Sequence, residues 1–123
     1  IEVDALCISV GLSPLSSLLG MMGAKMRYVP QLGGLVPVIN KHHQTTLKNV
    51  YVAGDVCGVE EASSAIVEGY LTGLLVSKQL GKEHIKYKEL HNDFVAQLEN
   101  LRSGPFGKTT REGLEELRNA YVE

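Results

Sequence analysis

The sequence predicts an α/β fold, and three observations lead to this prediction. Short apolar runs at 5–10 and 49–53 are typical of buried strands, and each is followed by a glycine. A long apolar pattern with broad helical coverage follows the second run, over about 61–80. Further helical patterns complete the chain, whose 123 residues suit one domain at most with a core of its own.

Composition and charge exclude several classes of function. The net charge is −2 and no long basic run is present, so nothing favours nucleic acid, and no apolar run is long enough to span a membrane. The two cysteines, Cys7 and Cys57, form no C-x-x-C, so we predict buried, reduced thiols in a cytoplasmic protein. Because the chain starts at Ile1 without a signal-peptide pattern, we interpret it as a piece of a longer protein.

The first elements along the chain are predicted to be a strand and a short helix. The strand is the apolar run 5–10. Ser13 and Pro14 then suit an N-cap and the first position of a helix. We expect this helix to stop near Gly20 or Gly23, because glycine favours helix ends.

Extended segments are predicted in the middle of the chain. The segments 25–29 and 35–39 flank the paired glycines Gly33 and Gly34, which suit a turn. The run 49–53, NVYVA, is rich in β-branched and aromatic residues and is predicted to be the strongest strand.

The C-terminal part is predicted to be helical. The long helix 61–80 should end at Gly81, a C-terminal stop. An amphipathic helix is predicted over 87–101. Thr109 and Glu112 have the spacing of a capping box and predict the start of a further helix.

Residues 49–69 carry the clearest chemical pattern. Gly54 lets the backbone pass close to a bulky group, and Asp55 follows the end of a strand, where α/β sheets bind ligands. A carboxylate there accepts hydrogen bonds from hydroxyl groups, and the helix that starts near Glu61 offers free N–H groups and a positive dipole end. These features together suit a flavin with its ribityl chain. The alternative interpretation is a turn aspartate that caps its own loop.

Three motifs in the right order resemble the pyridine nucleotide-disulfide oxidoreductase superfamily. Residues 46–55, TLKNVYVAGD, resemble its second FAD-binding motif, in which an apolar strand ends at Gly-Asp. Residues 4–14, DALCISVGLSP, resemble the last strand of its NAD-binding domain. Residues 34–38, GLVPV, resemble the strand where the chain re-enters the FAD domain. The resemblance covers roughly residues 4–80.

This resemblance implies the C-terminal fragment of a flavoprotein with two dinucleotide-binding domains. Residues 1–29 would end the NAD(P)-binding domain, 30–82 would supply the last strand and helix of the FAD-binding domain, and 83–123 would form a helical tail. No G-x-G-x-x-G phosphate loop occurs, so we expect only a partial FAD site, with NAD or NADP bound by the full-length chain. We also expect 1–29 to lie outside the compact unit that contains 50–80, either packed on another polypeptide or folded back onto 35–39.

The resemblance also assigns residues to the cofactors. They are Gly11, Gly54, Asp55, Ser63, Ser64 and Ala65. The Gly-Asp pair would bind the ribityl hydroxyls and the pyrophosphate region. The backbone amides of the three helix residues would face the flavin pyrimidine edge, where the helix dipole stabilises the reduced ring. The first glycine would lie near the nicotinamide. No catalytic residue, metal ligand, iron–sulfur cysteine set or catalytic disulfide is assigned.

Within the superfamily, three phrases resemble the alpha-type subunit of heteromeric amine-oxidising enzymes. These phrases are ISVGLSPLSSLL, YVPQLGGLVPV and GVEEASSAIVEG. The group includes sarcosine oxidase, dye-linked proline dehydrogenase, opine oxidase and hydrogen cyanide synthase. The resemblance implies an FAD-dependent oxidoreductase subunit that passes on electrons from a partner subunit, which oxidises the amine. The alternatives are an NAD(P)H-dependent flavin reductase of the same superfamily and a non-catalytic assembly module.

Two further pairs of polar residues have structural interpretations. His42 and His43 have no third metal ligand near them, so a solvated loop is favoured over a metal site. Glu60 and Glu61 could act as acid–base groups, but first-turn carboxylates that complement the helix dipole are favoured.

Overall fold

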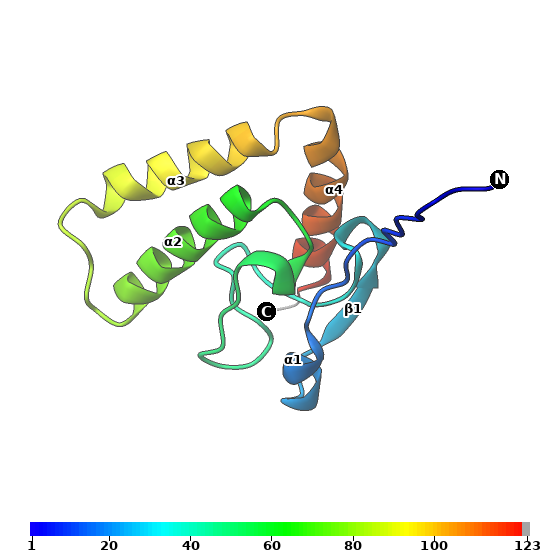
Figure 1. Ribbon diagram of the computed structural model, residues 1–123. Helices are drawn as coiled ribbons and strands as arrows, with labels where there is room; N and C mark the ends of the chain where they lie inside the picture. The colour runs from blue at the N-terminus through cyan, green and yellow to red at the C-terminus, as the bar shows by residue number, and fades with distance from the viewer. Residues whose placement is uncertain (122–123) are drawn as a thin grey trace.

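A computed structural model of the chain describes residues 1–121 and combines helices with one small sheet, which is compatible with an α/β fragment (Figure 1). Its elements in chain order are α1 (Ser17–Met21), β1 (Met26–Val29), the 3₁₀ turn η1 (Pro30–Leu32), β2 (Gly34–Pro37), the 3₁₀ turn η2 (Gly54–Cys57), α2 (Ala62–Gln79), α3 (Tyr87–Leu101) and α4 (Pro105–Ala120).

The sheet consists of two antiparallel strands. β1 pairs with β2 so that Met26 lies opposite Pro37 and Val29 lies opposite Gly34. The turn η1 joins them and is followed by its C-cap Gly33, whose φ of 85° is in the left-handed region that glycine adopts without strain. This arrangement confirms the extended segments that the glycine pair predicted.

A buried apolar cluster, here called the sheet cluster, joins the sheet to distant parts of the chain. α4 packs against η1 and β1 and closes this core. The buried members of the cluster are Leu19, Ala24, Val29, Leu32, Val36, Ile39, Val52, Cys57, Leu114 and Leu117. The prediction that 1–29 stands apart from 50–80 is therefore wrong, because residues from both ranges share one core. The expected folding back onto 35–39 is present for β1, which pairs with β2.

α2 and α3 lie side by side as a helical hairpin (Figure 1). Its own apolar cluster is built on Val67, Leu71 and Leu98. α2 ends at Gln79 with Leu80 as its C-cap. Gly81 follows directly, with a φ of 72°, and donates its N–H to the carbonyl of Lys78 at 2.9 Å. The predicted helices over 61–80 and 87–101 and the glycine stop are confirmed.

Residues 1–13, here called the arm, have no regular secondary structure and project from the rest of the molecule (Figure 1). The strand predicted at 5–10 is not formed. A strand requires a hydrogen-bonded neighbour, and within residues 1–121 no hydrogen bond joins the arm to the rest of the chain. Cys7 is consequently exposed, against the prediction, whereas Cys57 is buried as predicted.

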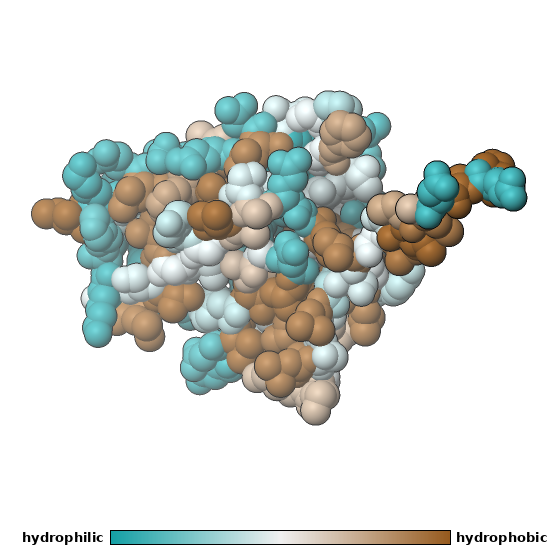
Figure 2. All heavy atoms as spheres, viewed as in Figure 1, coloured by the Kyte–Doolittle hydropathy of each residue, from teal (hydrophilic) through white to brown (hydrophobic). Residues whose placement is uncertain are grey.

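Apolar side chains are exposed on the arm and at the end of the molecule where α1 lies (Figure 2). α1 begins at Ser17 with Ser16 as its N-cap, so the predicted start at Ser13 and Pro14 is wrong. The Ser16 hydroxyl donates a hydrogen bond to the carbonyl of Leu35 instead. Within residues 1–121, no helix has the length and apolar character needed to cross a membrane.

Two other predicted elements differ from the structure. The segment 49–53 is not a strand: its neighbours come from its own loop, where Gln44 forms an isolated bridge with Tyr51. α4 begins at Pro105, four residues before Thr109, so the predicted capping box is wrong. Proline at the first helical position has no N–H to leave unpaired and has a φ suited to the helix, which explains the earlier start.

Candidate functional site

The Gly-Asp turn, formed by Gly54 and Asp55 at the start of η2, lies against the first turn of α2. Gly54 has a φ of 75°, and a Cβ added there would lie 3.3 Å from the Cβ of Ala65. Asp55 is exposed, and its carboxylate has no hydrogen-bond or ion-pair partner within residues 1–121. The predicted approach of the turn to the start of a helix is therefore present.

The first turn of α2 has backbone donors without helical acceptors. Glu61 is the N-cap and makes no capping hydrogen bond with its side chain. The first backbone bond runs from the Ala65 N–H to the Glu61 carbonyl, at 3.2 Å, so the earlier N–H groups, including those of Ser63 and Ser64, have no acceptor within the helix. Ala65 thus places its methyl group against the turn. Its backbone N–H, which was predicted to face the flavin, donates to the Glu61 carbonyl instead.

Gly11 is not part of this arrangement. It lies in the exposed arm with a φ of 86°, and a Cβ added there would meet no atom within 4 Å. The structure therefore brings together five of the six assigned residues, and their role toward a cofactor stays a prediction.

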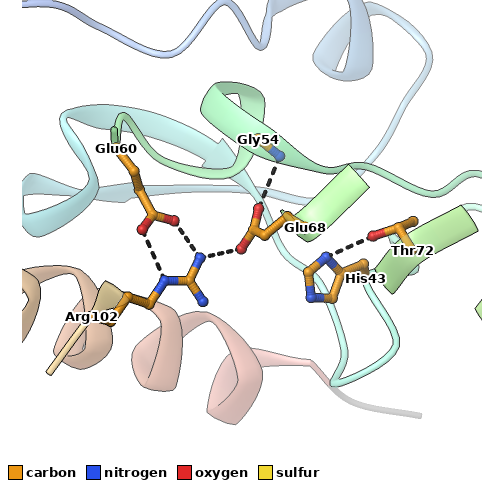
Figure 3. Close-up of polar contacts among 6 residues, drawn as sticks. All are labelled: His43, Gly54, Glu60, Glu68, Thr72 and Arg102. Carbon is orange, nitrogen blue, oxygen red and sulfur yellow. Dashed lines mark hydrogen bonds and ion pairs between the residues drawn. The ribbon is translucent and has the colours of Figure 1, made fainter. Parts of the chain in front are cut away.

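A buried ion cluster, formed by Glu60, Glu68 and Arg102, lies next to the Gly-Asp turn (Figure 3). Arg102 caps the C-terminus of α3, and its Nε donates to Glu60 Oε2 at 2.8 Å. Its Nη2 donates to Glu60 Oε1 and to Glu68 Oε1. The three side chains are 8%, 9% and 2% exposed for Arg102, Glu60 and Glu68, so this is an interior ion network rather than a surface pair.

Glu68 connects the ion cluster to the Gly-Asp turn. Its second oxygen, Oε2, accepts the N–H of Gly54 at 2.9 Å, so both oxygens of the buried carboxylate are in use (Figure 3). Hydrogen bonds to an ionised acceptor are roughly twice as strong as neutral ones. Glu68 therefore holds the backbone of the turn at the residue that precedes Asp55.

The electrostatics of the cluster favour fixed charges over proton transfer. Burial opposes the charged form of Arg102, but the hydrogen bonds and charges of Glu60 and Glu68 outweigh it and raise the pKa of Arg102. Burial, with the charges of the same two glutamates, raises the pKa of the Cys57 thiol well above its usual range. Cys57 therefore stays protonated and is a poor nucleophile.

His43 is buried beside α2 rather than solvated. Its Nδ1 lies 3.0 Å from the Thr72 hydroxyl (Figure 3), and burial lowers its pKa. The predicted solvated loop describes only His42, which is exposed. The local cause is a turn at Asn40, whose side chain accepts the N–H of His42 at 2.8 Å, while its carbonyl accepts the N–H of His43 at 3.0 Å.

Sequence reasoning did not find the contacts of three charged residues. Glu60 precedes α2 and pairs with Arg102, and Glu61 is the N-cap, so the interpretation of both as first-turn carboxylates is wrong. Glu68 and Arg102 were not assigned to any site. The available signal was a charge on a buried helix face: Glu68 lies between Val67 and Leu71, both of which are buried. Within residues 1–121 no group of three or more potential ligands could hold a metal ion.

Comparison with known proteins identifies the family. The model of the family described as pyridine nucleotide-disulphide oxidoreductase matches residues 1–69 of the 123. The chain belongs to this family. Pyridine nucleotide-disulphide oxidoreductases bind FAD and NAD(P), and the matched residues include the Gly-Asp turn, Glu60 and Glu68 but end before Arg102. No curated protein and no solved structure matches the chain.

The residues present fit part of a cofactor of this family. An exposed carboxylate without a partner, at Asp55, suits hydroxyl groups of a ribityl or ribose chain. The unpaired N–H groups at the start of α2 suit an electron-rich ring edge or a phosphate. Both features come from the matched part of the oxidoreductase.

Proposed function

We propose that the chain is the C-terminal segment of an FAD-dependent oxidoreductase subunit and that it holds part of the FAD. One observation carries this proposal. The Gly-Asp turn packs against the start of α2, which places an unpartnered acceptor, Asp55, beside unpaired N–H donors. A flavin nucleotide offers both complements, hydroxyl donors on its ribityl chain and acceptors on its pyrimidine edge.

Each residue of the site has a distinct role in this proposal. Asp55 accepts hydrogen bonds from the ribityl hydroxyls, and Gly54, without a side chain, lets the first turn of α2 approach the Gly-Asp turn at Ala65. The N–H groups of Ser63 and Ser64 donate to the pyrimidine edge, where the positive end of the α2 dipole favours negative charge. When bound, the flavin supplies the ring that accepts and passes on electrons.

The substrate class and partners follow from the resemblance of the sequence. We propose oxidation of an amine or amino acid of the sarcosine or proline type, with electrons arriving from an amine-oxidising partner subunit. The remainder of the flavoprotein chain would supply the first phosphate loop and the NAD(P)-binding sheet. The exposed apolar side chains of the arm, such as Leu6, Ile8 and Val10, support a neighbouring polypeptide that covers the arm.

A second candidate is an NAD(P)H-dependent flavin reductase. It is favoured by the match to a family named for its pyridine nucleotide. Anaerobic mixing of the purified full-length protein with NADH or NADPH, or with sarcosine or proline in the presence and absence of the partner subunit, separates the two candidates. Loss of flavin absorbance with a nicotinamide alone supports the reductase. Loss that requires the amine and the partner subunit supports the amine-oxidising enzyme. A full-length protein without flavin supports an assembly module instead.

Asp55→Ala in the full-length protein tests the site. A hydrogen bond to a charged acceptor contributes about 1.5–3 kcal/mol, so the FAD dissociation constant should rise roughly ten- to a hundredfold. Flavin absorbance after dialysis measures the retained cofactor. Asp93→Ala, which removes an exposed acid of α3, is the control and should retain FAD as the wild type does. Full retention by Asp55→Ala would contradict the assignment.

A further inference from the structure

We propose that Arg102 is a positioning residue for FAD: through Glu68 it fixes the backbone of the Gly-Asp turn, so the C-terminal helices control how tightly FAD is held. This inference rests on the proposed function and extends it, because the resemblance assigns the cofactor only to residues of the Gly-Asp turn, the start of α2 and the arm. Arg102 lies beyond all of them and beyond residues 1–69, which match the family.

The first step is the hold of Glu68 on the turn. The Gly54 N–H donates to Glu68 Oε2 at 2.9 Å, and Gly54 adopts a φ of 75°. This N–H belongs to the Ala53–Gly54 peptide group, so Glu68 anchors the backbone one residue before Asp55 and limits where the Asp55 side chain can lie. A turn that loses its acceptor therefore also loses the placement of the carboxylate.

The second step is the dependence of Glu68 on Arg102. Glu68 is 2% exposed, and its other oxygen accepts a hydrogen bond from Arg102. A buried carboxylate without a cationic partner is costly, and it responds by binding a proton or by turning toward water. A protonated carboxyl group is a weaker acceptor for the Gly54 N–H, and a rotated one no longer reaches it.

The third step is the position of Arg102 between two helices. It caps α3, and α4 starts three residues later at Pro105. The junction is tight, since a Cβ added at Gly107 would lie 2.3 Å from the Arg102 carbonyl oxygen. Arg102 also pairs with Glu60, which lies between η2 and α2. One guanidinium therefore links the α3–α4 junction to the segment between η2 and α2, through Glu60, and to α2 itself, through Glu68.

A double-mutant cycle on FAD affinity tests this coupling. The variants are Arg102→Met, Glu68→Gln and the double variant, measured by flavin fluorescence titration of the full-length protein. Each single change should raise the FAD dissociation constant about tenfold, which is ~1.4 kcal/mol, and the double variant should bind no more weakly than the weaker single variant. Arg27→Met is the matched control, because it breaks an exposed Arg–Glu pair at 2.7 Å and should leave FAD affinity unchanged.

A second readout follows the turn without flavin. Amide hydrogen exchange at Gly54 should accelerate about tenfold in Arg102→Met if the opening free energy falls by ~1.4 kcal/mol. The Val38 N–H, bonded to the Lys25 carbonyl at 2.8 Å, is the internal reference and should exchange as in the wild type. Should Arg102→Met fail to fold, Arg102→Lys replaces it. Lysine keeps the charge but loses the forked geometry, so intermediate values are expected for both readouts.

The outcomes separate the two proposals. Unchanged FAD affinity with unchanged Gly54 exchange in a folded Arg102 variant would overturn the inference. Additive effects in the cycle would also overturn it, since they would show that Arg102 and Glu68 act independently. A wild-type protein that binds no FAD would refute the proposed function. If Gly54 still exchanges faster in Arg102→Met than in that wild type, the link between Arg102 and the turn is retained.

Discussion

Glu68 and His43 are buried polar residues, and each has hydrogen-bond partners that offset the cost of its burial. Glu68 lies on the buried face of α2, where both its oxygens are bonded. Removing one member of such a buried pair typically costs about 3–5 kcal/mol, because the remaining charge is left uncompensated. His43 meets the same requirement without charge: it is buried as a neutral ring beside the Thr72 hydroxyl.

The neutral ring of His43 should make stability depend on pH. Burial lowers the pKa of His43 and outweighs the charge of Glu68, while Arg118 and Arg102 lower the pKa further. Below the ordinary histidine pKa of about 6.5, the unfolded chain therefore binds a proton that the folded chain does not. The contribution of neutral His43 is complete above pH ~6.5 and is lost as pH falls below it, by at most ~1.4 kcal/mol per pH unit.

Urea unfolding at pH 7.5 and pH 5.5 measures this loss. The wild type should have a lower free energy of unfolding at the more acidic pH. His43→Gln, which keeps a hydrogen-bonding group near Thr72, should show a smaller difference between the two conditions. His84→Gln removes an exposed histidine and should keep the wild-type difference. An equal difference in His43→Gln and the wild type would exclude His43 as the source.

The helices differ in how closely they approach their neighbours. α4 packs on η1 at Gly113, where an added Cβ would lie 2.6 Å from the Cγ of Leu32. Gly73, on α2, faces open space, since an added Cβ there would meet no atom within 4 Å. Glycine therefore permits close packing in α4, whereas in α2 it only lowers the helix propensity.

Alanine substitutions at these two glycines should have opposite effects. Gly73→Ala should raise the free energy of unfolding by up to about 1 kcal/mol, the difference in helix propensity. Gly113→Ala gains the same propensity but overpacks Leu32, which typically costs about 1–3 kcal/mol, so a net loss is expected. Thermal unfolding followed by circular dichroism measures both. A stabilised Gly113→Ala chain would show that η1 moves away without cost.

The molecule as a whole consists of a sheet cluster, a helical hairpin and an arm. The buried ion cluster lies where the first two meet, since Glu68 belongs to α2 and Glu60 lies between η2 and α2. The arm makes no hydrogen bond to the rest of residues 1–121, so its exposed apolar side chains contribute nothing to either core. The free energy of folding is therefore expected to reside in residues 14–121.

Limited proteolysis tests this division. Chymotrypsin at low concentration should cut first within the arm, after Leu6 or Leu12, and the remaining chain should keep its helical circular dichroism signal. Tyr28 is a built-in control: its side chain is exposed, but its backbone belongs to the paired strand β1 and should resist cleavage. Loss of helical signal after removal of the arm would contradict this account.

The sequence by itself determined the elements that depend on neighbours along the chain. The periodicity of 87–101, the stop at Gly81 and the paired glycines between two extended segments all describe interactions over a few residues. The Gly-Asp turn and the helix start after it were predicted for the same reason, since both lie within residues 54–65.

Only the tertiary structure decided which distant groups meet. Glu68 and Arg102 are 34 residues apart, and His43 and Thr72 are 29 apart, so no local pattern pairs them. The apolar runs 5–10 and 49–53 have strand composition but form no strand, because a ladder depends on a neighbouring backbone and not on the residues of the run. Burial, charge pairing and strand pairing are properties of two segments at once, and one segment alone does not contain them.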